Sequence, residues 1–371
     1  MVEIVTFDPD LHQQAWEAFI VASYRDPNYV ALSPEFLRWQ FLDNPANDTG
    51  GYTLWLALHQ GAVVAQLGYV PFMGLTPEGE SFRGAYPINL MALPEYRASG
   101  LGVILLSRLL RETPCLVNPG ANQAGSALGR GLGMQDLGCL NRHICVTDVA
   151  AARALAVEGR LPAVAESVGQ AARPSSAYVM AIGRLPAETP EGFLPPVPAC
   201  RAERSRDFFR WRYETHPAFT YEFVLSPDLA SVLVFHAERE RNTGALIIRI
   251  VDLLAREEHQ DALLGAVVQA AKERGAAIVD FFCSLGCYDT SLKRAGFFDE
   301  AQHQDGRIAA LFQPLDFRDA SIRVLASNPP GQGPEFPWYI TKADSDQDRP
   351  NDKNAVGRSP GRASASAVDP T

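Results

Sequence analysis

Phe36-Leu-Arg-Trp-Gln-Phe-Leu-Asp-Asn-Pro45 is the most informative stretch of this 371-residue chain, because it occurs twice. It aligns without gaps with Phe208-Phe-Arg-Trp-Arg-Tyr-Glu-Thr-His-Pro217, and both copies share the pattern Phe-apolar-Arg-Trp-x-aromatic-x-x-x-Pro. The two copies start 172 residues apart, which is much longer than the repeats of solenoid proteins. Since the chain has only 5 tryptophans, two in the same frame indicate two copies of one domain.

The same succession of elements follows each copy. After the first copy, the apolar runs 52–58 and 62–70 flank a short glycine-containing turn, which predicts a hairpin. After the second copy, runs over 221–225, 231–237 and 245–254 predict three connected strands. Each half then continues with a helix, a strand and a second helix, over 103–112, 115–117 and 124–131 in the first half and over 262–273, 277–282 and 289–296 in the second. This order predicts an α+β fold with two mixed antiparallel and parallel sheets flanked by helices.

The length of the chain and its composition divide it into parts. At roughly 100–200 residues per domain, 371 residues correspond to about two domains. An alanine-rich helical stretch over 149–157 precedes the segment 186–198, in which five prolines exclude a helix or a central strand. We therefore predict an N-terminal domain over 1–148, a helical and proline-rich linker over 149–200, a C-terminal domain over 201–325 and an extended, largely disordered tail over 326–371.

Charge and apolar patterning exclude several classes of protein. The formal net charge is −10, so the chain lacks the basic surface that nucleic-acid binding requires, and it is unsuited to an anionic membrane surface. No run of apolar residues reaches the length of a membrane-spanning helix. The N-terminal residues read as a strand rather than a signal peptide. We expect a cytoplasmic protein without a nucleic-acid or membrane partner, and the oligomeric state stays open.

The 6 cysteines of the chain are dispersed and form no CxxC pair. In a chain without an export signal, such thiols are reduced core residues, so we expect no disulfide and no metal site. An Asp-x-Asp-x-Asp pattern at 344–348 resembles the start of a calcium loop, but Arg349 replaces the glycine that such a loop needs. We interpret these acids as solvated tail residues, or as groups that attract a cationic amine.

The stretch from Asn89 to Leu106 carries the main functional signal. A strand is predicted to end near Leu93, a turn to begin at Pro94 and a helix to open at about Gly100. The turn contains Arg97-x-x-Gly100-x-Gly102. Glycines let the backbone approach an anion closely, and the N–H groups and dipole of a helix N-terminus hold phosphate. The spacing fits neither the dinucleotide-binding fingerprint nor a P-loop.

This segment resembles the acetyl-CoA loop of the GNAT superfamily of N-acetyltransferases, which has the pattern Arg/Gln-x-x-Gly-x-Gly/Ala between a strand and a helix. The later segment 118–134 is similar to the family's second cofactor element, and the resemblance covers about residues 2–146. The segments 211–217 and 338–349 give the chain a further likeness to bacterial proteins with tandem GNAT-like domains that act in amino-sugar or surface-polysaccharide pathways.

The resemblance implies acetyl-CoA as co-substrate and assigns the residues that would hold it. The main chain of Met91, Ala92 and Leu93 would pair with the pantetheine arm. The diphosphate would be held by Arg97 and by the N–H groups of Ala98, Ser99, Gly100, Leu101, Gly102 and Val103. Asn122 would lie near the thiol end.

The second half departs from this pattern. At the equivalent place, 253–262, the glycines are missing and Glu257, Glu258 and Asp261 stand where phosphate would bind. Carboxylates repel a diphosphate, and side chains block the approach of the backbone. The segment 283–298 still resembles the family's closing helix and Gly-Phe turn. We therefore expect a degenerate GNAT-like domain that contributes to the acceptor site or supports the first domain.

Residues for proton transfer are harder to assign. His143 lies in a strand-like run and has a suitable pKa for accepting the amine proton, and Glu95 flanks the loop. Tyr86 is a candidate for protonating the thiolate. Each has an ordinary alternative, as a strand histidine, a surface carboxylate and a buried tyrosine. For the repeated motif, packing is favoured for Trp39 and Trp211; the alternative is that the arginine before each tryptophan, at 38 or 210, holds an anionic acceptor.

The sequence thus predicts an acetyl-CoA-dependent N-acetyltransferase that moves an acetyl group to a small-molecule amine, with an amino sugar among the candidates, by direct attack on the thioester. No serine or cysteine has the context of a covalent nucleophile. Two alternatives stay open. One is an aminoacyltransferase of the Fem type, which also pairs GNAT-like domains but would need a basic surface for transfer RNA. The other is a non-catalytic acyl-CoA-binding or interaction protein.

Overall fold

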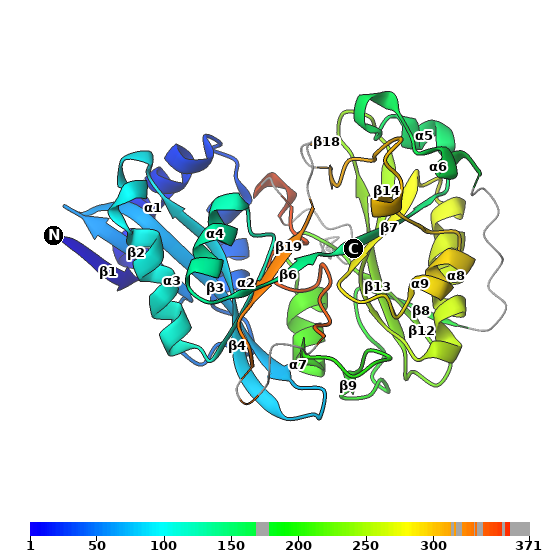
Figure 1. Cartoon of the computed structure of the whole chain (residues 1–371), viewed down its shortest axis with the longest axis horizontal. Coiled ribbons are helices and arrows are strands. Elements are labelled where there is room, and N and C mark those ends of the chain that lie inside the picture. The colour runs from blue at the N-terminus through cyan, green and yellow to red at the C-terminus, as the bar shows by residue number, and fades with distance from the viewer. Residues whose placement is uncertain are drawn as a thin grey trace, which may run out of the picture.

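Two mixed β-sheets, each covered by helices, form two lobes that lie side by side (Figure 1). The structure is a computed structural model, and it describes residues 1–167, 178–312, 315–316, 321–329, 331, 337–350 and 353–356. The predicted fold class, α+β with two mixed sheets, is confirmed. None of the described helices is long and apolar enough to cross a lipid bilayer.

The first sheet has the strand order β1-β2-β3-β4-β5-β19-β6. Its strands are β1 (Val2–Thr6), β2 (Leu54–His59), β3 (Ala62–Leu75), β4 (Ser81–Ala92), β5 (Cys115–Pro119), β6 (Gln135–Cys139) and β19 (Arg323–Ala326). One face packs on α1 (Pro9–Tyr24) and α2 (Pro34–Phe41), and the other packs on α3 (Leu101–Glu112) and α4 (Gln123–Gly131). The hairpin predicted from the turn at Gly61 joins β2 to β3.

The second sheet has the order β16-β7-β15-β14-β13-β12-β8. Its strands are β7 (Asn141–Val146), β8 (Val179–Ile182), β12 (Glu222–Leu225), β13 (Val232–Arg239), β14 (Leu246–Leu254), β15 (Ile278–Cys283) and β16 (Phe298–Asp299). The accompanying helices are α5 (Val149–Arg153), α6 (Ala163–Ser167), α7 (Arg206–Phe209), the π-helical turn η4 (Arg210–Glu214), α8 (Glu257–Glu273) and α9 (Asp289–Arg294). The core of this lobe joins the sheet to α8.

Short elements connect these parts. The two-residue strands are β9 (Gly192–Phe193), β10 (Arg201–Ala202), β11 (Arg204–Ser205), β17 (Leu311–Phe312) and β18 (Leu315–Asp316). The 3-10 turns are η1 (Val30–Leu32), η2 (Pro94–Ser99), η3 (Val157–Gly159), η5 (Glu300–Gln302) and η6 (Lys353–Ala355). Strand β10 joins the lobes, because it pairs with β3 of the first sheet.

The two sheets exchange one strand each. β7 belongs in sequence to the first half but pairs with β15 and β16 of the second sheet. β19 follows the second half but lies between β5 and β6 of the first sheet, where Figure 1 shows it in orange. With this exchange the two sheets have the same strand order. The lobes cannot separate without breaking both strand pairings, although the sequence predicts a boundary at residue 148.

The repeated motif lies where the two halves meet. The indole Nε1 of Trp39 donates to the carbonyl of Trp211, and the indole Nε1 of Trp211 donates to the carbonyl of Trp39, both at 2.8 Å. The rings stack with centroids 5.1 Å apart and planes tilted by 17°. This reciprocal pair confirms the packing role and marks an approximate twofold axis between the halves. Arg38 and Arg210 pair instead with Asp43 and Asp207.

The expectation of a largely disordered tail from 326 onward is wrong for the segment 337–350, here called the C-terminal segment. Trp338, Tyr339, Ile340 and Asp344 are all buried within it. Polar composition suggested disorder because exposed charges do not drive folding. In the structure these charges are paired with buried partners, such as Arg204 for Asp344.

Candidate active site

The parallel strands β4 and β5 separate soon after they meet. They pair only through Gly84 with Cys115 and Ala85 with Leu116. Beyond this point β5 turns to β19, while β4 continues along β3 as far as Ala92. Within the described part of the chain, the edge of β4 after Ala85 therefore has no strand beside it. We call this region the β4–β5 divergence.

A bulge in β4 lies at this open edge. The register with β3 shifts between Gln66 and Gly68, and Asn89 adopts a left-handed backbone conformation with φ of +51°. Asparagine tolerates this conformation better than most residues. The Gln66 amide donates to the Asn89 carbonyl at 3.2 Å, and the Tyr24 hydroxyl donates to the Asn89 side-chain oxygen at 3.1 Å. The bulge is thus fixed from two sides.

The predicted cofactor loop is open to solvent. After β4, residues Pro94–Ser99 form the turn η2, Gly100 has φ of +79°, and α3 begins at Leu101 without a side-chain cap. The first N–H groups of a helix have no partner within it. A Cβ atom placed on Gly100 would have no other atom within 4 Å. Backbone donors are therefore exposed at the N-terminus of a three-turn helix, which is the arrangement that binds phosphate.

Ten of the eleven predicted cofactor residues lie in this one stretch. Met91, Ala92 and Leu93, at the end of β4, are half-buried. Arg97 is exposed on η2. Ala98, Ser99 and Val103 are exposed, Gly100 and Gly102 are half-buried, and Leu101 is buried. The eleventh residue, Asn122, caps α4, since its side-chain oxygen accepts from the Gly125 N–H at 2.8 Å. Helix capping accounts for an asparagine there, and a contact with the thiol end stays a prediction.

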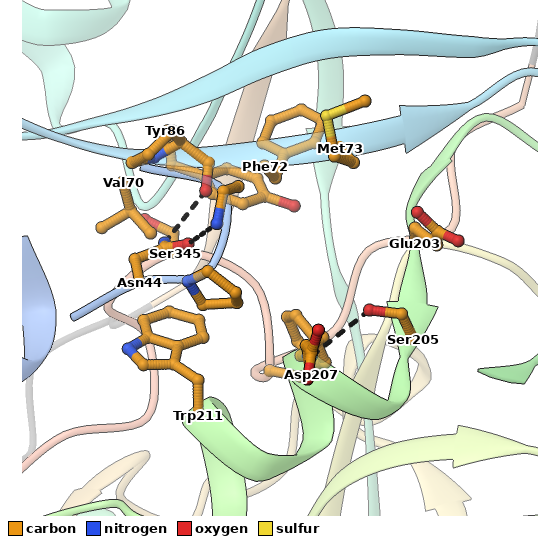
Figure 2. Close-up of a pocket in the computed structure, with 15 residues that line it drawn as sticks. Asn44, Val70, Phe72, Met73, Tyr86, Glu203, Ser205, Asp207, Trp211 and Ser345 are labelled. Carbon is orange, nitrogen blue, oxygen red and sulfur yellow. Dashed lines mark hydrogen bonds between the residues drawn. The ribbon is translucent and has the colours of Figure 1, made fainter. Parts of the chain in front are cut away.

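A pocket of about 200 Å³ opens between the lobes, next to the point where β4 and β5 separate. Figure 2 shows side chains from β3 and β4 on one side of it and from the β11–α7–η4 region on the other. We call it the shared pocket. Its lining residues are Asn44, Pro45, Ala46, Val70, Pro71, Phe72, Met73, Tyr86, Glu203, Ser205, Asp207, Phe208, Trp211, Ala343 and Ser345.

Of the three candidates for proton transfer, the structure brings Tyr86 to this pocket. Its hydroxyl donates to Asp344 Oδ1 at 2.6 Å, and Arg204 binds the same carboxylate through both terminal nitrogens at 3.1 and 2.9 Å. Burial, with Asp344 beside it, raises the pKa of Tyr86 well above its usual value. Its hydroxyl proton is directed at Asp344, so its role in protonating a thiolate stays a prediction.

The other two candidates lie elsewhere. Glu95 is exposed on η2, in the cofactor loop. His143 is on β7 of the second sheet, with its Nε2 atom 3.5 Å from Asp289 Oδ1, and it is not among the pocket residues. Burial lowers the pKa of His143 below its usual value. The strand exchange explains this position, because β7 leaves the half of the sequence in which it is encoded.

The second sheet has an equivalent region that is filled. β14 and β15 pair in parallel from Ile247 to Ile250, and residues 340–343 of the C-terminal segment lie between the strands beyond that point. On the β15 side, Thr341 forms an antiparallel β-bridge with Cys283, and the Ser284 N–H donates to the Ile340 carbonyl at 3.0 Å. On the β14 side, the Ala343 N–H donates to the Val251 carbonyl at 3.1 Å. We call this region the β14–β15 divergence. No cofactor arm can lie where the chain's own backbone already pairs with both strands.

Sequence reasoning missed several residues at the site. Glu203, just past the expected linker, lines the pocket, and Asp344 of the expected tail holds the pocket residue Tyr86 by a hydrogen bond. Ser345 lines the pocket with φ of +63°, a conformation that costs a non-glycine residue about 1 kcal/mol or more. Among these residues, Asn89 could have been noticed from the sequence, because an asparagine inside a strand-like run just before the loop indicates an irregularity in the strand.

Comparisons with known proteins support the fold. No protein-family model and no curated protein match the sequence. A GCN5-related N-acetyltransferase from Anabaena variabilis has a TM-score of 0.53 and 14% identity, over 88% of this chain and 72% of that one. A conserved protein of unknown function from Enterococcus faecalis, a probable N-acyltransferase, has a TM-score of 0.53 and 9% identity, over 89% and 73%.

A third solved structure, Saccharomyces cerevisiae N-myristoyltransferase with bound myristoyl-CoA, has a TM-score of 0.51 and 12% identity, over 90% of this chain and 86% of that one. At these identities the likeness concerns the fold. The chain therefore has the two-domain GNAT fold of N-acyltransferases, as its sequence predicts.

Proposed function

We propose that this protein is an acetyl-CoA-dependent N-acetyltransferase whose donor site is in the first half of the chain. One observation carries the proposal: on β4, an open strand edge leads to an uncapped, glycine-initiated helix at one end and to the shared pocket at the other. A donor along the β4–β5 divergence and an acceptor in the pocket would thus approach each other at one strand. The solved structures with this fold include N-acetyltransferases and an acyl-CoA complex.

The donor would be held mainly by backbone. Donors from Gly100 to Val103, with the helix dipole behind them, suit the diphosphate, and Arg97 adds a positive charge at the loop. The main chain of residues 91–93 at the edge of β4 suits the amides of the pantetheine arm. Fixed backbone donors near the bulge at Asn89 suit the carbonyl oxygen of the thioester, which gains negative charge during attack.

The reaction joins the acceptor nitrogen to the acetyl carbon and breaks the carbon–sulfur bond of the thioester. The attacking amine must be neutral and loses one proton, and the departing thiolate takes up one proton. The chain's contribution is to orient the two substrates, since alignment removes most of the entropic barrier. Glu95 and Tyr86 are proposed only as neighbours through which protons are exchanged. An amino sugar is one acceptor compatible with this chemistry.

Binding and turnover test the proposal together. Acetyl-CoA should bind with a stoichiometry of one per chain in calorimetry, and at a hundredfold excess over its Kd it should stabilise the fold by about 2.7 kcal/mol. Incubation with acetyl-CoA and a panel of amines should give products that carry the mass of one added acetyl group. Absence of both stabilisation and product would favour a non-catalytic interaction protein. Aminoacyl transfer without acetyl transfer would favour the Fem-type alternative.

A further inference from the structure

The polar groups of the shared pocket are mostly satisfied by the protein itself. The Asn44 amide donates to the Pro71 carbonyl at 3.0 Å, and its oxygen accepts from the Ala46 N–H at 2.8 Å. The Ser205 hydroxyl accepts from the Phe208 N–H at 3.3 Å. The Tyr86 hydroxyl is bound to Asp344. None of these groups needs a ligand to complete its hydrogen bonds.

Glu203 differs from these groups. Glu203 is half-buried, and its carboxylate makes no hydrogen bond and no ion pair among the described residues. Its backbone N–H donates to the Met73 carbonyl at 2.8 Å, which fixes its main chain directly to β3. The next residue, Arg204, is buried against Asp344, whereas Glu203, which lies between β10 and β11, lines the pocket and is half-buried. Glu203 therefore offers the pocket a negative charge that no ion pair among the described residues neutralises, although the buried Arg201 interacts with it electrostatically from outside the lining.

The charge balance of the pocket is one-sided. Its second acid, Asp207, is exposed at the rim and pairs with Arg210 at 2.9 Å, so its charge is partly offset. No lysine, arginine or histidine is among the described residues that line the pocket. A phosphate or carboxylate on a ligand would face Glu203 and Asp207 without a cation to pair with. A cation, in contrast, gains from a carboxylate in a partly desolvated place.

The remaining lining suits an apolar body. Phe72 stacks on Tyr86 with ring centroids 4.5 Å apart, and Val70, Met73, Phe208 and Trp211 complete the apolar surface. Aromatic and aliphatic walls of this kind bury hydrocarbon or ring surface. They provide few free hydrogen-bonding groups for the hydroxyls of a sugar, and such hydroxyls would lose their water without compensation.

From this lining we infer that the acceptor is a small primary amine on an apolar or aromatic body, bound as its ammonium form by Glu203 and excluded when it carries a phosphate. This inference rests on the proposed function and narrows its acceptor class. One proton leaves the ammonium group for solvent before attack, and the neutral amine then reacts as described above. Glu203 acts as the binding group, and the aromatic side chains hold the body of the amine.

The test combines binding with turnover. 2-Phenylethylamine is the probe, 2-phenylethanol is its uncharged analogue, and glucosamine and glucosamine 6-phosphate represent sugars without and with a negative charge. Calorimetric titrations are made with coenzyme A both present and absent. We expect 2-phenylethylamine to bind at least tenfold more tightly than the alcohol and than either sugar, and to be acetylated with the highest kcat/KM of the four.

Glu203→Gln keeps the shape of the side chain and removes its charge. We expect it to raise the Kd and the KM for 2-phenylethylamine at least tenfold, with the affinity for acetyl-CoA and the melting temperature unchanged. Asp207→Asn is the matched comparison, with an expected change below threefold because Arg210 already offsets that charge. Preferred acetylation of glucosamine 6-phosphate, or equal effects of the two substitutions, would overturn the inference.

The experiments distinguish an error in the acceptor class from an error in the proposed acetyl transfer. If acetyl-CoA binds but 2-phenylethylamine neither binds nor reacts, the acceptor class is wrong and the donor site stands. If the amine binds through Glu203 but acetyl-CoA does not bind, the pocket assignment stands and the proposed acetyl transfer is wrong.

Discussion

The β4–β5 and β14–β15 divergences occupy equivalent places in two sheets of the same strand order, yet one is open and the other is filled. In the first half, eight residues, 93–100, connect β4 to α3 and present exposed backbone donors. In the second half, only Ala255 and Arg256 separate β14 from α8, and residues 340–343 lie between the strands. The second half therefore differs from the first in two ways: its connecting loop is shorter, and its separating strands pair with another part of the chain.

The C-terminal segment links these two regions. Asp344 binds Arg204 and Tyr86, and Arg204 also binds Asp252 of β14 at 2.7 Å. A continuous series of hydrogen bonds therefore joins β14 to β4 through side chains that are all buried. The C-terminal segment thus both fills the β14–β15 divergence and forms part of the lining of the shared pocket.

The largest expected effect comes from breaking the series of buried hydrogen bonds that joins β14 to β4. Asp344→Ala should lower the free energy of unfolding by about 3–5 kcal/mol, because it leaves buried Arg204 with one carboxylate instead of two. Denaturation in urea would measure the change. Asp207→Ala, which breaks an exposed ion pair with Arg210, is the control and should cost less than about 1 kcal/mol. Equal losses in both variants would mean that the C-terminal segment does not couple the lobes.

The second-largest expected effect distinguishes the N-terminus of α3, where we propose that the diphosphate binds, from the N-terminus of α8. Gly100→Glu should weaken acetyl-CoA binding at least about a hundredfold, which corresponds to about 2.7 kcal/mol, by placing a carboxylate at the diphosphate and straining a residue with φ of +79°. Gly275→Glu is the matched control, since Gly275 has φ of +67° and an equally open surrounding. Glu258→Ala at the N-terminus of α8 should change nothing. Calorimetry on the three variants would refute the assignment if their affinities were equal.

A smaller effect concerns Lys342, which lies in the segment that fills the β14–β15 divergence. Burial, and then Arg249, lowers the pKa of Lys342 to about 7, and Asp280, Asp348 and Arg142 also face it. The unfolded chain binds more protons than the folded chain between about pH 7 and pH 10, so stability should rise with pH over this range. Relative to Lys342→Met, the wild type should gain about 2 kcal/mol between pH 7 and pH 9. A constant difference in unfolding free energy would show that Lys342 is not buried there.

The smallest effect concerns the bulge in β4. Asn89→Ala should destabilise the fold by about 1 kcal/mol more than Asn89→Gly, because glycine accepts the left-handed conformation and alanine does not. Both variants lose the hydrogen bond from Tyr24, so the comparison isolates the backbone. Thermal denaturation would measure the difference. Identical stabilities would indicate that the bulge is absent in solution.

The features predicted from the sequence are those encoded locally. The loop around Gly100 follows from glycines between a strand and a helix, and the repeat follows from a motif that recurs at Trp39 and Trp211. The exchange of β7 and β19 could not be predicted, because each strand has the same alternation of side chains in either sheet. The burial of Asp344 could not be predicted either, because its partner Arg204 lies 140 residues away and polar composition alone suggests disorder.

A crystal structure of the chain with acetyl-CoA would show whether the donor lies along the β4–β5 divergence. We predict one molecule per chain, with its diphosphate within hydrogen-bonding distance of the N–H groups between residues 98 and 103, its acetyl end facing the shared pocket, and residues 340–343 still paired with β14 and β15. A diphosphate bound at Arg256, or displacement of residues 340–343 by the cofactor, would contradict it.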